Sequence, residues 1–457
     1  MPDATTPRPA RAADAADAPA FGPGRRLQAM LDVEVALAEA LAAASVIPAS
    51  SVGPIRGAAR AEHFDHVALE AAARDAGNPV IPMVSALIAL VARTDPVAAG
   101  HVHWGATSQD VLDTALVLQL RDSVGDTVDA LTSAADAAAD LAARYAGTPM
   151  AGRTWLQQAT PITFGLKALG WMSGLDRARE RLAAARNAAS DLQFGGATGT
   201  LSSLGGAAAE VAAVLGARLG LRVPDTAWHT ERSRVADLAT ALGVTCGVLG
   251  KIGRDLTLLG QTEIGEVTEP STPGRGGSST MPHKHNPVAS VRAVAASVRA
   301  PGLVATVLAA MAQEHERAAG GWQAEWDTLP ALAMLTLDSA CTVAGVLPAL
   351  RVDDARMRAN LDAAGGVARA EGLASALAPC VGRTEASRLV SDACADAAVG
   401  GRTLEEVASA MPGIRAHLDA GAIAAALNPA ALTAGCPALV ERALTARRHD
   451  RKGSRHG

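Results

Sequence analysis

Apolar residues recur every three or four positions through most of this chain, a spacing typical of helices that bury one face. The longest such run extends from Ser108 to Ala146, contains no proline, and places Leu112, Leu116 and Leu120 on one stripe. Alternation with a period of two residues never lasts for more than a few positions, so we expect little strand. The pattern therefore predicts an all-α protein. Its further helices are expected over residues 25–45, 82–93, 161–190, 233–264, 288–315 and 327–347.

Glycine and proline divide this pattern into segments of different character. Residues before about position 20 lack periodicity, whereas Gly365, Pro379 and Pro412 cut the chain after residue 352 into short helical stretches. The long helices between these regions favour an elongated central bundle. We therefore predict three helical domains between two flexible ends: an N-terminal arm (1–20), an N-terminal helical domain (21–107), a central long-helix bundle (108–352), a C-terminal helical domain (353–445) and a tail (446–457).

The composition narrows the classes of function. Hydrophobic residues make up 49% of the 457 residues but aromatic residues only 2%, which favours closely spaced helices with small apolar side chains. The formal charge of -5 lacks the basic excess typical of proteins that bind nucleic acid or a membrane surface. No apolar run approaches the ~18 residues expected of a membrane-spanning helix. We therefore expect neither nucleic acid nor a membrane as a partner.

The N-terminus and the cysteines bear on the location of the protein. The first residues are polar and contain no apolar segment of a signal peptide. The cysteines are odd in number and share no CxxC spacing, which fits reduced thiols better than a disulfide framework. We therefore expect a cytoplasmic protein.

Four polar islands interrupt the apolar helices. They are residues 101–110 (HVHWGATSQD), 152–161 (GRTWLQQATP), 277–287 (GSSTMPHKHNP) and 313–317 (QEHER), the last followed by Trp322 and Trp326. A helix cap would explain one Ser or Thr, but not this density of imidazole, hydroxyl, amide and ammonium groups. Free amides at a helix N-terminus attract carboxylates, and Arg317 offers a two-pronged donor for the same group. The islands therefore indicate a site for an anionic ligand.

Other kinds of site fit these islands less well. The glycines of 276–279 lack the GK[ST] ending of a phosphate-binding loop, and those of 195–199 do not follow a predicted strand. The pairs His101/His103 and His283/His285 offer nitrogen ligands, but no cysteine or acidic cluster accompanies them, so we expect no metal site. Glu314 and Glu316 are equally consistent with a solvated helix end.

The segment 277–287 matches the signature GSSxMPxKxNP in full. Together with the islands at 107–110 and 152–154, it resembles the fumarase/aspartase superfamily over about residues 25–440. The resemblance implies an all-helical, three-domain protomer and a homotetramer in which each active site is built from segments of three subunits. It also implies a small carboxylated substrate, with no metal and no organic cofactor.

The resemblance assigns roles to individual residues. Ser278, the first serine of the loop, would transfer a proton at the carbon next to a carboxylate, with Lys284 as the alternative proton donor. Because this step creates a dianionic aci-carboxylate, it requires positioned cations, and Lys284 with Arg317 would supply them. The implied substrate-binding residues are His103, Thr107, Ser108, Gln109, Arg153, Thr154, Gln158, Ser279, Met281, Asn286 and Arg232.

One departure from the superfamily pattern lies in the second island. Most of these lyases read GRTHxQ there, and the histidine protonates the departing amine or hydroxide, whereas this chain has Trp155. A carboxylate, whose conjugate acid has a pKa near ~4, leaves or attacks without a proton at neutral pH. We therefore count Trp155 as a catalytic candidate that forms an apolar wall and positions the substrate.

With Trp155, and with His315-Glu316-Arg317 followed by two tryptophans, the chain resembles the carboxymuconate cycloisomerases of the superfamily. This implies an intramolecular lyase that converts 3-carboxy-cis,cis-muconate, a tricarboxylate, to 4-carboxymuconolactone in the protocatechuate branch of the β-ketoadipate pathway. Two alternatives stay open: an adenylosuccinate-type lyase that releases fumarate, and a catalytically silent helical scaffold. His285 replaces an arginine of many relatives, and the run Glu231-Arg232-Ser233-Arg234 leaves open which arginine has a role.

Overall fold

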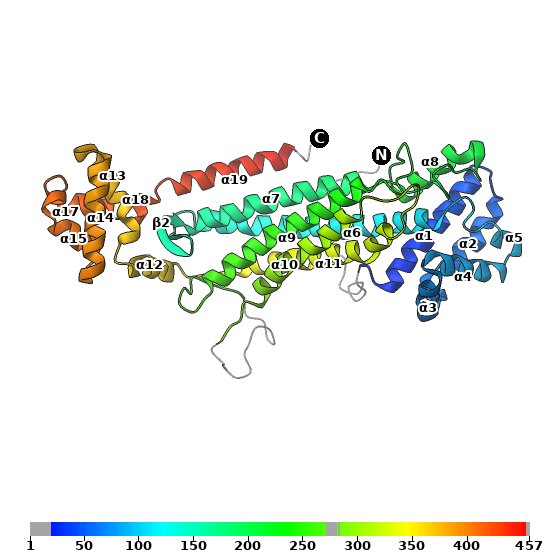
Figure 1. Cartoon of the computed structure of the whole chain (residues 1–457), viewed down its shortest axis with the longest axis horizontal. Helices are drawn as coiled ribbons and strands as arrows, with labels where there is room; N and C mark the ends of the chain where they lie inside the picture. The colour runs from blue at the N-terminus through cyan, green and yellow to red at the C-terminus, as the bar shows by residue number, and fades with distance from the viewer. Residues whose placement is uncertain (1–19, 271–280, 282–283, 454–457) are drawn as a thin grey trace. The chain divides into compact units, whose positions relative to one another are not determined.

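The computed structural model describes residues 20–270, 281 and 284–453, and its elements are almost all helices (Figure 1). This confirms the all-α prediction. The N-terminal arm predicted over residues 1–20 lies outside the described residues except for its last position. The elements before residue 200 are α1 (Pro23–Ala43), α2 (Val52–Ala58), α3 (His66–Ala76), α4 (Val80–Ala92), α5 (Pro96–Ala99), α6 (Ser108–Arg144), β1 (Pro149–Thr154), β2 (Gln157–Thr163) and α7 (Phe164–Ala189).

The remaining elements include the other long helices and the short helices near the C-terminus. They are α8 (Ala208–Leu219), α9 (Ser233–Leu259), β3 (Val267–Thr268), α10 (Val288–Ala309), α11 (Gly321–Val346), β4 (Arg351–Val352), α12 (Asp354–Ala363), α13 (Ala370–Val381), α14 (Arg383–Gly400), α15 (Leu404–Ala410), α16 (Pro412–Arg415), α17 (Ala420–Ala426), α18 (Pro429–Leu432) and α19 (Cys436–Gly453).

The long helices begin close to the predicted positions but some end earlier. Helix α6 starts at Ser108 and α10 at Val288, as their sequence patterns indicated. Helix α10 ends at Ala309 and not at 315, because the polar island at 313–317 forms a turn in which His315 has a φ of 47°. Such a left-handed residue cannot continue a right-handed helix. Helix α11 differs in the other direction, because it starts at Gly321, before the predicted 327, and ends at Val346, close to the predicted 347. Apolar periodicity thus locates the helices but not every boundary.

The chain forms two compact units, each built from several separate stretches of sequence. The first contains the described part of 1–130 with 178–247 and 296–339, and the second contains 131–177 with the described parts of 248–295 and 340–457. Helices α6, α7, α9, α10 and α11 contribute residues to both units. The predicted division into three domains is a different partition of the chain and stays a prediction.

Within the first unit, α1 packs against α8 and α2, and α4 packs against α2, α3 and α5 (Figure 1). Leu31, Leu37 and Leu41 of α1 are completely or almost completely buried, together with Met83 and Leu87 of α4. The buried face of α1 is thus the apolar stripe that its sequence pattern indicates. Burial of one such side chain stabilises the fold by about 1.5–3 kcal/mol.

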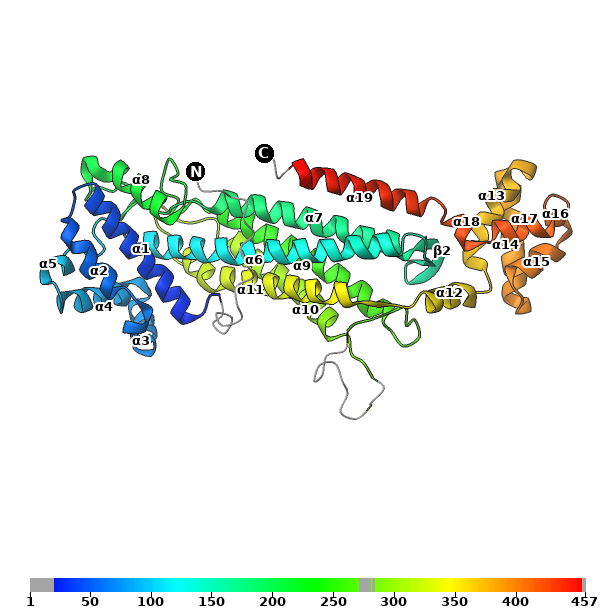
Figure 2. The same cartoon turned by 180° about the vertical axis from the view of Figure 1, so that it is seen from behind.

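Within the second unit, the helices from α13 to α17 share a core of their own. Leu373, Leu377, Leu404, Ile414 and Ile423 are all completely buried in this core. Figure 2 shows the same helices from behind, gathered beside one another. Each is too short to be stable alone, so this shared core supplies most of their stability.

Residues 446–453 of the predicted tail (446–457) are helical, because α19 continues to Gly453. Arg447 pairs with Asp176 of α7 and with Asp136 of α6, and Arg451 also pairs with Asp136. These ion pairs hold a helix that has few apolar residues. The excess of arginine, which suggested a frayed end, is what fixes it in place.

Three helices of the described chain are long and apolar enough to cross a membrane, by length and composition only: Ser233–Leu259, Val288–Ala309 and Gly321–Ala349. The sequence analysis predicted no membrane-spanning helix, because no unbroken apolar run approaches the required length. Alanine, valine and leucine raise the mean hydropathy of these helices, although polar residues interrupt them.

Candidate active site

Arg317 of the fourth island contacts the first island. Its Nη2 atom donates to Thr107 Oγ1 at 3.1 Å and to the carbonyl oxygen of Ala197 at 2.9 Å, and Nη1 lies 3.4 Å from Gln109 Oε1. All three acceptors are neutral, and Arg317 makes no ion pair with any residue that the structure describes. Its positive charge is therefore uncompensated and is available to an anionic ligand.

The carboxylate of Asp110, in the first turn of α6, joins this island to a glycine turn. It accepts hydrogen bonds from the backbone N–H groups of Thr107 (3.0 Å), Gly195 (3.0 Å) and Gly196 (2.8 Å), and it contacts His229 Nε2 at 2.8 Å. A Cβ atom at Gly195 would lie 2.5 Å from that of Ala227. The glycines of 195–199, for which the sequence analysis excluded a nucleotide-binding loop, thus include a turn around the protein's own carboxylate.

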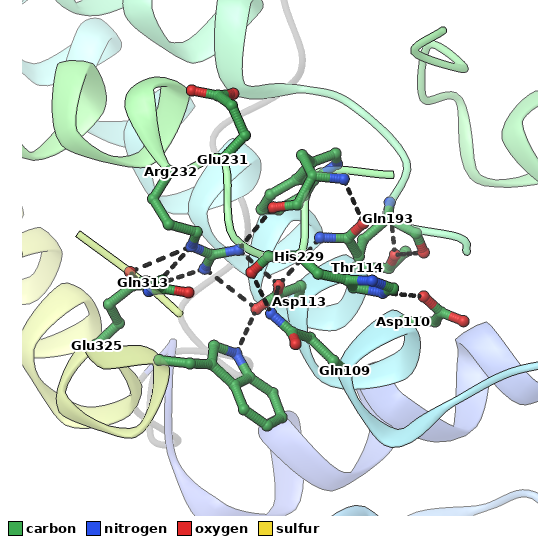
Figure 3. A network of polar contacts seen from close by, with 12 residues as sticks. Gln109, Asp110, Asp113, Thr114, Gln193, His229, Glu231, Arg232, Gln313 and Glu325 are labelled. Carbon is green, nitrogen blue, oxygen red and sulfur yellow. Dashed lines mark hydrogen bonds and ion pairs between the residues drawn. The ribbon is translucent and has the colours of Figure 1, made fainter. Parts of the chain in front are cut away.

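Arg232 lies at the centre of a buried network of polar side chains (Figure 3). Its guanidinium pairs with Asp113 of α6, at 2.7 Å from Nη1 to Oδ2, and with Glu325 of α11 through Nε and Nη2. Trp322 Nε1 donates to Asp113 at 2.9 Å. Arg232 is inaccessible and its donors are occupied, so the structure does not support the predicted substrate contact.

Burial and the neighbouring charges together determine which groups of this network are charged. Burial disfavours the charged form of Arg232, but Asp113 and Glu325 outweigh burial and raise its pKa further. Burial raises the pKa of Glu325, and the nearby charge of Asp113 adds to this increase, although Arg232 opposes it. One buried cation thus faces two carboxylates, which makes the network a structural connection between α6 and α11.

Gln109, another predicted substrate-binding residue, is also completely buried. Its Nε2 atom donates to the carbonyl oxygen of His229 at 2.8 Å and to Asp113 at 3.1 Å. Its Oε1 atom faces Arg317. Gln109 therefore helps to hold Arg317 in place, and its own side chain is not accessible to a ligand.

The other candidates of the first island are more accessible. Ser108 is half-buried, and its hydroxyl makes no hydrogen bond within the described chain. His103 contacts Glu34 of α1 through Nδ1 at 2.6 Å. In the first unit, Arg317 and Thr107 are thus in direct contact. His103 and Ser108 are partly exposed and offer further polar atoms on the segment around the start of α6.

The second island forms a β-hairpin, which the sequence analysis did not predict. Strands β1 and β2 pair antiparallel, and their two-residue turn consists of Trp155 and Leu156. Both have left-handed backbones (φ of 51° and 64°), which side chains other than those of Gly, Asn and Asp rarely adopt. Trp155 is 97% exposed and Leu156 78% exposed. Such strain and exposure in apolar residues are typical of functional positions.

The polar candidates of this hairpin bind other residues of the second unit. Arg153 makes a two-pronged pair with the buried Glu266, at 2.6 and 3.0 Å. Gln158 Nε2 donates to the carbonyl oxygen of Asn360 at 2.9 Å, and the Asn360 amide in turn donates to Glu266. Arg153 is thus neutralised, in contrast to Arg317. Thr154, beside the turn, is exposed.

Part of the signature loop lies outside the described residues, including Ser278 and Ser279. Lys284 and Met281 are exposed, and the Lys284 amide donates to the carbonyl oxygen of Met281 at 3.0 Å. Asn286 is half-buried, just before α10. The proton-transfer role of Ser278 therefore stays a prediction.

The sequence interpretation missed the acidic residues that hold these segments. Glu269 caps α10 by accepting hydrogen bonds from the amides of Ala289 (3.2 Å) and Ser290 (2.8 Å). Glu34, Glu266 and Glu325 hold His103, Arg153 and Arg232. Glu34 and Glu325 are isolated in helices and belong to no motif. The sequence signal for Glu266 and Glu269 was that they lie shortly before the signature loop.

Known proteins resemble this chain over most of its length. The family model described as Lyase matches residues 15–302. The chain is 49% identical to the 3-carboxy-cis,cis-muconate cycloisomerase of Pseudomonas aeruginosa over 93% of this chain and 92% of that protein. It is 41% identical to the nitrosuccinate lyase of Streptomyces davaonensis, over 92% and 90%.

A solved structure extends this likeness to the fold. The 3-carboxy-cis,cis-muconate lactonizing enzyme from Pseudomonas putida matches with a TM-score of 0.89 and 43% identity, over 94% of this chain and 96% of that one. Sequence, signature loop and fold thus agree over nearly the whole length. The chain belongs to the lyase family of the fumarase/aspartase superfamily.

Proposed function

We propose that this protein is a 3-carboxy-cis,cis-muconate cycloisomerase that forms 4-carboxymuconolactone. Trp155 carries the proposal, because it occupies the motif position at which most of these lyases have the histidine that protonates a departing amine or hydroxide. The identity of 49% to a protein of that name supports the same conclusion. An adenylosuccinate-type reaction and a silent scaffold lack comparable support.

The first step of the proposed reaction is the binding of a tricarboxylate. One carboxylate binds to Arg317 and the Ser108 hydroxyl, and Lys284 and Asn286 hold the others. Arg317 suits this role because it is held by neutral acceptors on a buried framework, so it needs no reorganisation when the anion binds. His103 contributes a second donor.

The bond-forming step is an intramolecular addition. A carboxylate oxygen of the substrate attacks the alkene and forms the lactone C–O bond, while the alkene electron pair moves into the neighbouring carboxylate as an aci-carboxylate. Ser278, or alternatively Lys284, delivers a proton to the carbon next to that carboxylate and regains one from water. Trp155 keeps the diene in its reactive shape. Opposite charge from Lys284 and Arg317 stabilises the intermediate.

The proposal includes a homotetramer with shared active sites, located in the cytoplasm. Helix α10 is apolar but presents much of its surface to solvent, with Val298 70% exposed and Val291 53% exposed. Exposed apolar faces of this kind are typical of subunit interfaces. The exposed hairpin tip at Trp155 would then reach an active site completed by another copy. Analytical ultracentrifugation tests this part of the proposal, which a monomer at micromolar concentration would contradict.

The assay also tests a second reaction, because a relative that is 41% identical to this chain is named nitrosuccinate lyase. Elimination of a nitro group would release nitrite, a weak base that also needs no proton. Trp155 is compatible with both leaving groups. The assay therefore follows the loss of diene absorbance from 3-carboxy-cis,cis-muconate and, separately, fumarate formation from nitrosuccinate and adenylosuccinate, with and without chelator. Persisting diene absorbance would overturn the proposal.

A further inference from the structure

Glu34 is a carboxylate buried in α1 that the proposed reaction does not use. Its side chain is 1% exposed, and its contact is between Oε1 and His103 Nδ1, at 2.6 Å. The other oxygen, Oε2, has no hydrogen-bonding partner among the described residues. A carboxylate in this position is costly to bury, because only one of its oxygens is satisfied. Leucine or methionine would fill the same volume without that cost.

His103 connects this carboxylate to the candidate site. It lies in the segment between α5 and α6, four positions before Thr107, and has a left-handed backbone with a φ of 62°. Its side chain is 21% exposed. Nε2, the second ring nitrogen, makes no hydrogen bond with any described residue, so it is available to a ligand. His101, two positions earlier, instead contacts the neutral Ser51 hydroxyl at 2.9 Å.

We infer that Glu34 is a positioning residue that keeps His103 as an imidazolium and presents its Nε2–H group to a substrate carboxylate. This inference rests on the proposed function, because the ligand is a carboxylate of the same substrate. With Glu34 ionised, Nδ1 must carry a proton to bond it, and this fixes the ring orientation. The second proton on Nε2 then makes His103 a charged donor.

The electrostatic surroundings support this assignment. Burial alone disfavours the imidazolium, but the hydrogen bond and charge of Glu34 outweigh it, and the charge of Asp110 adds to them, so the pKa of His103 is raised. Glu34 faces the ring from α1 and Asp110 from the first turn of α6. The imidazolium therefore persists above the usual histidine pKa of about 6.5 and is lost as the pH rises through the raised value.

The decisive experiment titrates His103 directly. Protein labelled with 13C at histidine Cε1 is titrated by NMR, and the His103 resonance is assigned by its loss in His103→Gln. We expect it to titrate above the ordinary histidine range in the wild-type protein and at lower pH in Glu34→Gln. Glu39→Gln is the matched control, because Glu39 lies on the same helix but pairs with Arg56 and Arg218 near the surface. An unchanged His103 titration in Glu34→Gln would overturn the inference.

Kinetics separate positioning from a merely structural role. At pH 8 we expect Glu34→Gln to raise KM for 3-carboxy-cis,cis-muconate roughly tenfold or more, the effect of losing one charge-assisted hydrogen bond, with a smaller change in kcat. At pH 6 the difference should shrink, because a larger fraction of His103 is then protonated in Glu34→Gln. Glu39→Gln should not change either parameter. A KM ratio independent of pH would indicate a structural role and contradict the inference.

The two proposals fail in different ways. If the wild-type protein does not consume the diene, the proposed function fails, whereas the NMR titration still tests the effect of Glu34 on His103. If Glu34→Gln does not fold, Glu34→Asp and His103→Gln replace it. His103→Gln should raise KM at both pH values, and Glu34→Asp should lower the pH at which KM begins to rise. Wild-type behaviour in both variants would overturn the inference.

Discussion

The guanidinium of Arg317 lies 3.1 Å from the hydroxyl of Thr107, although 210 positions separate them in the chain. This contact joins the loop before α11 to the start of α6. Because every hydrogen-bond acceptor of Arg317 is neutral, the pair forms a cationic site with a fixed geometry.

Arg317→Lys should raise KM for the carboxylated substrate by about ten- to a hundredfold, because lysine keeps the charge but loses the two-pronged geometry. Steady-state kinetics at fixed ionic strength measure this effect. Arg74→Lys, an exposed change on α3, is the matched control and should leave the kinetics unaltered. Equal KM values for Arg317→Lys and wild type would show that Arg317 does not hold substrate.

Removal of Arg232 should destabilise the protein strongly. Arg232→Ala leaves Asp113 and Glu325 buried without their cation, a change that typically costs about 3–5 kcal/mol. Chemical denaturation measures the loss. Arg388→Ala, which breaks exposed ion pairs on α14, is the control and should not shift the midpoint. A stable Arg232→Ala with altered KM alone would instead restore the predicted substrate contact.

Glycine at position 152 is required by the close approach of the two hairpin strands. A Cβ atom there would lie 2.3 Å from the carbonyl oxygen of Thr160, next to an irregularity in the strand pairing. Gly152→Ala should therefore cost about 1–3 kcal/mol. Gly170→Ala, at an open position of α7, should be neutral or stabilising by up to about 1 kcal/mol. Thermal unfolding compares the two, and equal midpoints would contradict the argument.

The docking of α19 should weaken in acid. Burial raises the pKa of Asp136, but Arg451 and Arg447 outweigh it, so that its pKa is lowered overall. A lowered pKa stabilises the folded form above the unfolded value of about 3.9, and this contribution is lost as the pH falls through the folded value. Hydrogen exchange in 436–453 should therefore accelerate in acid, once exchange rates are corrected for pH.

Asp136→Asn should produce the same faster exchange at neutral pH, because it removes the charge without acid. The neighbouring, exposed Asp140→Asn is the matched control and should leave exchange in α19 unchanged. If Asp136→Asn exchanged like the wild-type protein, the ion pairs would not be what holds this helix.

The sequence predicted the fold better than the detailed contacts of the site. Leucine spacing located α6 almost to the residue, because a buried stripe is a local property of the chain. The hairpin at Trp155 escaped notice because its strands are short and barely alternate. Arg232 and Gln109 looked like ligand contacts but are buried, since a motif specifies residue types and not which of them face inward. Glu34 could be found only once folding placed it beside His103.

The four hydrogen bonds of Asp110 have a consequence for selectivity. Its buried carboxylate joins Thr107 just before α6, the turn at Gly195 and Gly196, and His229 through these bonds. Asp110 thereby fixes the backbone at Thr107, whose hydroxyl accepts a hydrogen bond from Arg317. Because Arg317 is the proposed holder of a substrate carboxylate, analogues in which that carboxylate is displaced should be rejected sharply.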